Sequence, residues 1–142
     1  MPITETRGVR NQNPGNIDYS PRNAWQGQLG LEVGVPKPRF ARFDSAENGI
    51  RALGKLLLTY QRKHQLKTVA ALIGRWAPTN ENNTAAYVRA VEASTGTRPG
   101  AEVDLTTSAV MQGFVKAIIR HENAGYAYPE PVLLEGVRRA LL

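Results

Sequence analysis

The chain has 142 residues, of which 42% are hydrophobic, and this supports one hydrophobic core in one domain over residues 1–142. It contains no cysteine and two histidines, which excludes a disulfide framework and a thiolate metal site. We therefore predict no metal and no other cofactor. The net charge of +6 indicates a polyanionic partner, and nucleic acid, an anionic membrane and the bacterial cell wall all qualify.

No apolar run approaches the roughly 20 residues that span a bilayer, and the first residues lack the apolar stretch of a signal peptide. We expect a soluble protein that is made in the cytoplasm, without membrane insertion. Its basic residues are spread along the chain rather than gathered in one tract, which argues against a nucleic-acid-binding arm.

Residues 1–44 are rich in Gly, Pro, Asn and Arg without a 3.6-residue apolar period, which predicts loops around a short antiparallel pair of strands. The strands are expected near residues 25–31 and 39–43. From Asp44 onward the apolar residues follow a helical period. This residue or Ser45 can cap a helix whose apolar residues recur every three or four positions up to about His64.

Two shorter helices are predicted next. The first begins at a Thr68 cap and ends before Pro78, because proline disfavours helical geometry in the residue that precedes it. The second covers residues 84–93, with Asn82 or Asn83 as its cap.

Two strongly apolar helices complete the chain. One opens at Thr106 or Thr107 and runs into the sequence RHENAG, and the last covers about residues 131–142. The predicted fold class is therefore mainly α, with about five helices and a small β-hairpin and loop region near the N-terminus.

The segment AIIRHENAG places the carboxylate of Glu122 at the end of a strongly apolar helix. Burial disfavours a charged carboxylate, so a glutamate there can keep a raised pKa and act as a general acid. The alternative is an ion pair with Arg120 or His121 at a frayed helix end. This segment alone leaves both interpretations open.

The segment WAPTNENNTAAYVRAV joins an amide-rich loop to a helix that carries Tyr87. Amides both donate and accept hydrogen bonds, which suits the hydroxyl and acetamido groups of N-acetyl sugars. On this interpretation Glu81, Asn82 and Thr84 line a sugar-binding groove. In the alternative, the polar residues cap the helix while Trp76 and Tyr87 fill the core.

The segment RGVRNQNPGNIDYS contains a tight NPG turn that begins at Asn13 and is followed by Asn16. By itself it predicts a turn and no chemistry. Asp44, in ARFDSAENGI, is likewise more often a helix cap than a catalytic group.

Four segments, taken together and in this order, resemble phage-encoded lysozyme-like proteins, some of which are catalogued only as virion structural proteins. They are RNQNPGNI, FDSAENGIRALGKLLLTYQ, WAPTNENNTAAYV and AIIRHEN, and they cover most of residues 7–125. The resemblance implies a lysozyme-like α+β fold and peptidoglycan degradation of the lytic transglycosylase or endolysin type. In the wider family of lysozymes, lytic transglycosylases and glucosaminidases, a glutamate ends a helix in an HES or HEN motif, and a tyrosine of another helix faces the cleft. These positions match Glu122 and Tyr87, the expected catalytic residues.

The resemblance also makes the NPG turn part of the substrate cleft. Asn13, Asn16 and His121 then join the amide-loop residues as candidate substrate-binding residues. In the family this turn follows the catalytic helix, whereas here it precedes it, so the order is circularly permuted. Permutation is tolerated when the original termini lie close together at the surface.

Cleavage of a β-1,4 glycosidic bond needs an acid, and a hydrolase usually needs a second carboxylate as well. The candidates are Glu81, Asp44 and Asp104, and none lies in a matching motif. By resemblance, a lytic transglycosylase needs one glutamate, which protonates the leaving group and then takes the proton of the muramoyl 6-hydroxyl. We therefore expect a lytic transglycosylase that cleaves between N-acetylmuramic acid and N-acetylglucosamine, with a hydrolytic muramidase or glucosaminidase as the alternative.

Two functions of other classes compete with this expectation. A virion structural or wall-binding protein can keep such a fold without activity. A nucleic-acid-binding protein would use the positive charge and interleaved aromatic residues, and would lose affinity steeply with salt. The expected partners are bacterial peptidoglycan and other phage virion proteins, without a specific nucleic acid. We expect a monomer that acts at the bacterial wall, either from the phage particle or after release through the inner membrane.

Overall fold

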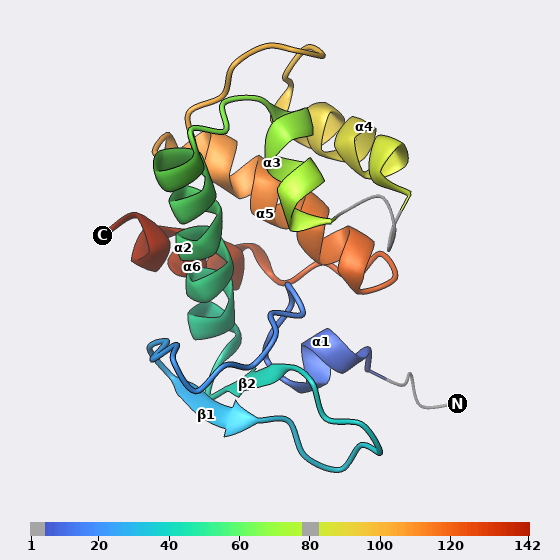
Figure 1. Ribbon diagram of the computed structural model, residues 1–142, viewed down its shortest axis with the longest axis vertical. Coiled ribbons are helices and arrows are strands. Elements are labelled where there is room, and N and C mark those ends of the chain that lie inside the picture. Colours follow the sequence, from blue (N-terminus) through green and yellow to red (C-terminus); the bar gives the residue numbers. More distant parts are fainter. Residues whose placement is uncertain (1–4, 78–82) are drawn as a thin grey trace.

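A computed structural model describes residues 5–77 and 83–142 (Figure 1). Within these ranges the chain forms six helices and one two-stranded sheet. The mainly α fold with a small hairpin near the N-terminus is confirmed. The elements are α1 (Arg7–Arg10), β1 (Gln28–Leu31), β2 (Ala41–Phe43), α2 (Ala46–His64), α3 (Val69–Trp76), α4 (Thr84–Thr95), α5 (Ser108–Glu122) and α6 (Glu130–Leu141).

The helix starts follow the polar caps of the sequence. The side chains of Ser45, Thr68 and Asn83 each accept a hydrogen bond from a backbone N–H in the first turn of α2, α3 and α4. Ser45 rather than Asp44 is thus the cap of α2. Helix α4 ends two residues later than expected, where Gly96 takes a positive φ of 70°.

Helix α1 was not expected, because the region before residue 44 was interpreted as loops around two strands. With four residues it is too short to show an apolar period. Thr6 caps it by accepting a hydrogen bond from the N–H of Val9. The described residues therefore contain one more helix, this single turn, than the five or so that were predicted.

The sheet has the predicted antiparallel pairing, with Gln28 opposite Phe43 and Leu31 opposite Ala41. An irregularity between Gln28 and Gly30 bends β1. A further bridge joins Asp18 to Phe40, so the segment after the NPG turn lies against the hairpin.

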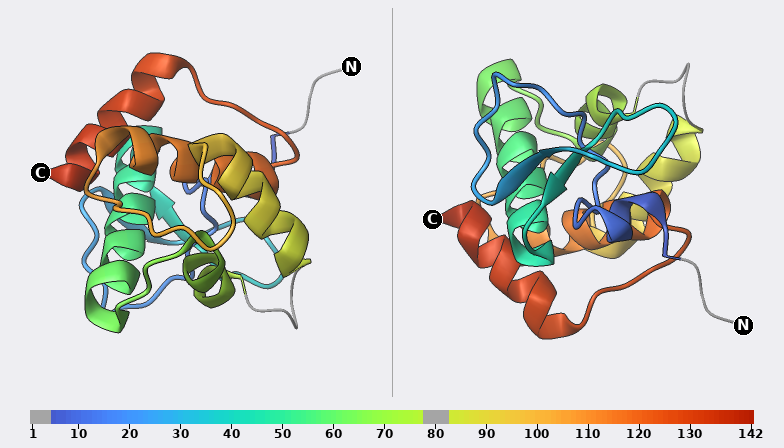
Figure 2. Two further views of the ribbon diagram at one scale, coloured as in Figure 1. Left: turned by 90° about the horizontal axis from the view of Figure 1, so that it is seen from above. Right: turned by 90° about the horizontal axis from the view of Figure 1, so that it is seen from below.

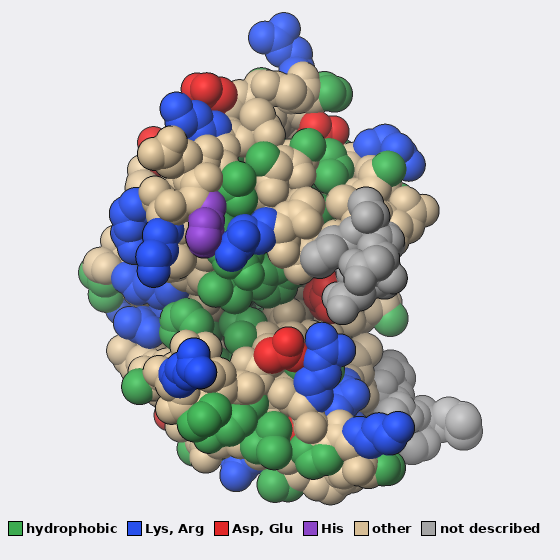
Figure 3. All heavy atoms as spheres, viewed as in Figure 1, with side chains coloured by type: hydrophobic (Ala, Val, Ile, Leu, Met, Phe, Trp, Pro, Cys, Tyr) green, Lys and Arg blue, Asp and Glu red, His purple; other side chains and the backbone are tan. Residues whose placement is uncertain are grey.

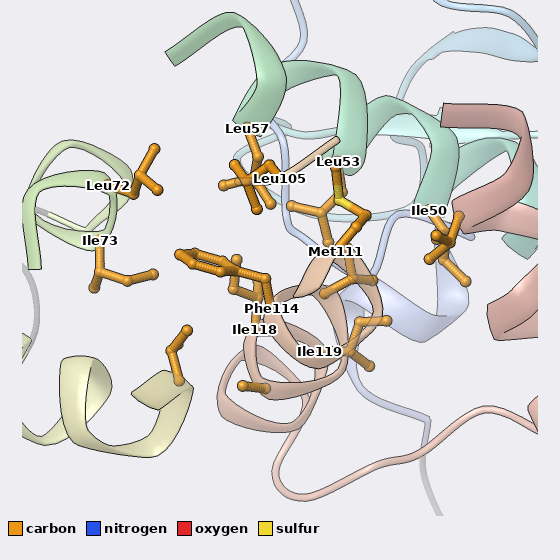
Figure 4. Packing of buried hydrophobic residues seen from close by; sticks show 14 of the residues in the cluster. Ile50, Leu53, Leu57, Leu72, Ile73, Leu105, Met111, Phe114, Ile118 and Ile119 are labelled. Carbon is orange, nitrogen blue, oxygen red and sulfur yellow. The ribbon is translucent and has the colours of Figure 1, made fainter. Parts of the chain in front are cut away.

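Helix α2 organises the packing. Its neighbour α6 approaches closely, because a Cβ on Gly54 would lie 2.6 Å from the Cβ of Ala140. Figure 2 shows α6 alongside α2, with α5 between α6 and α4. The apolar face of α5 fills the centre, where Met111, Phe114 and Ile118 meet side chains of α2 and α3 (Figure 4).

The molecule has a helical part, which contains α3, α4, α5 and the C-terminal half of α2, and a hairpin part, which contains the NPG turn and the sheet (Figure 1). Helix α2 runs from the hairpin to the helical part and holds both. No helix in the described ranges is long and apolar enough to cross a membrane.

Candidate functional site

A cleft of about 680 Å³ opens between the two parts of the molecule. Figure 3 shows this face as a hollow between the helical part above and the hairpin part below, with charged side chains along it. The helical part contributes Leu56, Tyr60, Trp76 and Glu122 to its walls. The hairpin part contributes Gly15, Asn16, Ile17, Asp18, Ser20, Asn23, Arg39 and Phe40.

Glu122 is the last residue of α5 and is half-buried in this cleft. Its Oε1 accepts a hydrogen bond of 3.2 Å from the Nδ2 of Asn16, and its Oε2 accepts one of 3.1 Å from the hydroxyl of Tyr87. Among the described residues it forms no ion pair with Arg120 or His121. The structure therefore brings Glu122 together with two of the residues predicted around it.

Tyr87 is fully buried in the core and reaches Glu122 only through its hydroxyl. The indole Nε1 of Trp76 donates a hydrogen bond of 3.1 Å to the same hydroxyl. Burial raises the pKa of Tyr87 far above its usual value, and the neighbouring Glu122 raises it further. Tyr87 was expected to face the cleft, but it lies beneath the cleft as a neutral hydrogen-bond donor. It also fills the core, as the alternative interpretation predicted.

His121 is exposed, and its ring stacks on that of Tyr87 with centroids 3.7 Å apart. It is not among the residues that line the cleft, and its contact with substrate stays a prediction. Thr84 donates a hydrogen bond of 2.8 Å to the carbonyl of Ala77. Glu81 and Asn82 lie outside the described residues.

Asn13 has a structural role in the NPG turn. It is fully buried, its Nδ2 donates to the carbonyls of Ile17 and Ala41, and its Oδ1 accepts from the N–H of Ile17. No part of its side chain faces the cleft, so the predicted substrate contact is corrected. A buried amide with all these bonds fixes the turn to β2 instead.

Asn16 lies at the end of this turn with a positive φ of 50°, a conformation that asparagine tolerates better than most residues. Its side chain lines the cleft and donates to Glu122, as described above. Asn16 is therefore the residue of the turn that reaches the site.

Asn123 was not predicted, although it follows Glu122 directly in the HEN motif. It is 1% exposed, and its Nδ2 donates to the carbonyls of Pro14 and Ile119, while its Oδ1 accepts from the hydroxyl of Thr6. These bonds fasten the end of α5 to the NPG turn. An asparagine after a run of apolar helix residues was the available signal.

Asp18 is the carboxylate that sequence reasoning missed. It lines the cleft from the hairpin part and forms an exposed ion pair of 2.7 Å with Arg39. Of the three expected second carboxylates, the two in the described residues, Asp44 and Asp104, do not line the cleft with Glu122. Asp44 accepts from the amide of Asn48, Asp104 accepts from Thr106 outside the cleft, and Glu81 is not described.

Buried Glu32 holds the hairpin wall of the cleft. Its carboxylate pairs with the guanidinium of Arg7 and accepts hydrogen bonds from the amide of Asn11 and the backbone N–H groups of Arg39 and Phe40. The bond from Arg7 is the largest of the causes that hold the pKa of Glu32 far below its usual value. This carboxylate joins α1 to the segment that carries Arg39.

The described residues contain no group of three histidine, aspartate or glutamate side chains arranged to hold a metal ion. The side chains that line the cleft offer carboxylates, amides, hydroxyl groups, a guanidinium and aromatic faces.

Comparison with known proteins finds a relative in a bacteriophage. The chain is 36% identical over 129 residues to Protein P5 of Pseudoalteromonas phage PM2, an alignment that covers 87% of this chain and 76% of the relative. No family model matches the chain.

Proposed function

The chain belongs to the family of Protein P5 of Pseudoalteromonas phage PM2, and we propose that it is a phage enzyme with a lysozyme-like fold that cleaves peptidoglycan. The bond cleaved is the β-1,4 linkage between N-acetylmuramic acid and N-acetylglucosamine. The observation that carries this proposal is the placement of Glu122 in a long polar cleft, with hydrogen bonds to both of its carboxylate oxygens.

The walls of the cleft suit a sugar chain. Tyr60 and Trp76 offer aromatic faces from the helical part, with ring centroids 6.5 Å apart. Amide, hydroxyl and charged side chains line the hairpin part. Sugars present apolar ring faces between hydroxyl groups, so a site with aromatic residues on one wall and polar groups on the other fits them.

In the proposed reaction, Glu122 acts twice. As a carboxylic acid it protonates the glycosidic oxygen, which leaves with its sugar as the C1–O bond breaks. As a carboxylate it then takes the proton of the muramoyl 6-hydroxyl, whose oxygen bonds to C1 and closes a 1,6-anhydro ring. One carboxylate suffices, which makes the protein a lytic transglycosylase.

Asp18 supports a second candidate, a hydrolase of the muramidase or glucosaminidase type. It lines the same cleft as Glu122 but belongs to the opposite wall. A second carboxylate in that position could activate water or stabilise positive charge on the sugar. In the described structure, however, it is paired with Arg39.

Digestion of purified peptidoglycan, followed by mass spectrometry of the released fragments, distinguishes these functions. We expect 1,6-anhydro products from the native protein. Reducing ends would instead establish the hydrolase. If the native protein releases nothing, the enzyme proposal is wrong, and the structural or wall-binding alternative takes its place.

Two isosteric variants locate the acid. Glu122→Gln keeps the shape of the side chain but removes the transferable proton, so we expect a loss of about 100-fold or more in rate. Glu102→Gln, which changes an exposed carboxylate outside the cleft, is the matched control and should cleave normally. Asp18→Asn should leave a transglycosylase active and disable a hydrolase.

A further inference from the structure

We propose that the side-chain amide of Asn16 turns over with the protonation state of Glu122, so that it serves both forms of the carboxyl group. Its NH₂ donates to the carboxylate, and its carbonyl accepts from the carboxylic acid. The value of such a device to catalysis rests on the proposed function, in which Glu122 acts first as an acid and then as a base.

The position of the Asn16 amide is well defined. The residue ends a turn that is tied to β2 by the buried amide of Asn13 and to α5 by that of Asn123. From this fixed turn, its Nδ2 lies 3.2 Å from the Oε1 of Glu122. Rotation about the terminal bond of the side chain would place Oδ1 there instead, without movement of the backbone.

The other end of the amide is the feature that suggests rotation. Oδ1 of Asn16 is buried and has no hydrogen-bond partner among the described residues. A buried acceptor without a partner costs free energy, so the orientation is not the best one for the amide alone.

The surroundings of this buried end are rich in oxygen. A Cβ placed on Gly8 would lie 2.5 Å from the Oδ1 of Asn123, 2.9 Å from the carbonyl oxygen of Asn13 and 3.0 Å from the Oδ1 of Asn16. Three acceptor oxygens, one of them the Oδ1 of Asn16, thus lie close to the same point beside Gly8. A donor, such as the NH₂ of the rotated amide, suits this place better.

Tyr87 determines which oxygen of Glu122 carries the proton. An indole N–H can only donate, so the bond from Trp76 uses a lone pair of the Tyr87 oxygen and leaves the phenol proton for the Oε2 of Glu122. Oε2 is therefore an acceptor in both forms. The transferable proton then belongs on Oε1, which faces Asn16.

A fixed Asn16 amide would oppose this proton, because an N–H and an O–H would point at each other. After rotation, the carbonyl of Asn16 accepts the Oε1–H bond and the NH₂ enters the oxygen-rich place beside Gly8. When Glu122 gives its proton to the glycosidic oxygen, the amide returns and its NH₂ stabilises the carboxylate.

Other titratable or charged groups also face Glu122. Asp18 and Arg39 lie on the opposite wall, Tyr60 lines the cleft from α2, and Tyr87 with His121 stacked on it lies below. They influence the pH at which the amide turns. The hydrogen bond to Oε1 comes from Asn16.

Neutron diffraction from deuterated crystals at two pH values tests the proposal directly, since it distinguishes an ND₂ group from an oxygen. The carboxyl ¹³C resonance of Glu122 first gives the pH range of its titration. We expect ND₂ toward Glu122 above this range and Oδ1 toward Glu122 below it. The same orientation at both pH values overturns the proposal, whether or not the protein cleaves peptidoglycan.

Kinetics of the variants provide the second test. Asn16→Gly keeps the positive φ and removes the amide, so we expect kcat to fall about 10- to 100-fold with little change in KM. Asn16→Asp places a second carboxyl group beside Oε1, so the two groups share one proton and the pH optimum moves upward. Gln112→Ala, which removes a half-buried amide of α5 outside the cleft, is the control. Native kcat and an unchanged pH profile in Asn16→Gly would contradict the proposal.

Discussion

Replacement of Glu32 by glutamine should destabilise the protein in a way that depends on pH. The side chain is 2% exposed, and Oε1 accepts from Arg7 and two backbone N–H groups, while Oε2 accepts from Arg7 and Asn11. The glutamine can keep its oxygen at the first position. Its NH₂ then meets the donors of Arg7 and Asn11, which lose their acceptor.

The size of the effect follows from these two donors. Asn11 is 5% exposed, so its unpaired amide costs roughly 1–3 kcal/mol. The side chain of Arg7 is 38% exposed and can turn toward water, which reduces its share. We expect a total loss of about 3 kcal/mol at pH 7, which lowers Tm by roughly 10 °C in a domain of this size.

The pH dependence has a definite sign. The pKa of Glu32 in the folded protein lies far below its usual value of 4.5, so its contribution to stability is complete above that value. As the pH falls below 4.5, the unfolded chain takes up the proton first, and the contribution decreases by about 1.4 kcal/mol per pH unit. The gap between native protein and variant should therefore narrow on acidification.

Urea unfolding of both proteins at pH 7 and pH 3 measures this gap. Glu135→Gln is the matched control, because Glu135 also forms ion pairs with arginine, here Arg138 and Arg139, but on the surface of α6. If Glu32→Gln loses no more stability than Glu135→Gln, or if its deficit is the same at both pH values, the assigned role of Glu32 is wrong.

Further predictions concern two glycines and the buried tyrosine. Gly8→Ala should destabilise the protein by about 1–3 kcal/mol, because the new methyl group would lie 2.5 Å from the Oδ1 of Asn123. Gly74→Ala, in an exposed turn of α3 with open space around it, should stabilise the protein by about 1 kcal/mol. Thermal unfolding measures the stability of both variants, and equal effects would refute the contact at Gly8. Tyr87→Phe removes the hydrogen-bond donor to Glu122 and should lower kcat for peptidoglycan about 10-fold. It should also lower the free energy of unfolding in urea by roughly 1 kcal/mol. An unchanged kcat would refute the role of Tyr87 as a positioning residue.

The sequence by itself determined the features that depend on neighbouring residues. Ser45, Thr68 and Asn83 mark the starts of their helices, because a cap bonds to a backbone N–H only a few positions away. The place of Glu122 at the end of an apolar helix was predictable for the same reason.

The resemblance pointed to Asn16 and Tyr87, but only the tertiary structure decided how polar residues contact Glu122. Asn16, Asp18 and Asn123 obtain their roles from contacts or cleft walls that join distant parts of the chain. Tyr87 meets Glu122 across 35 positions, and Asn16 meets it across 106. No local period or spacing encodes such a contact, because it depends on how the helices and the hairpin pack around α2.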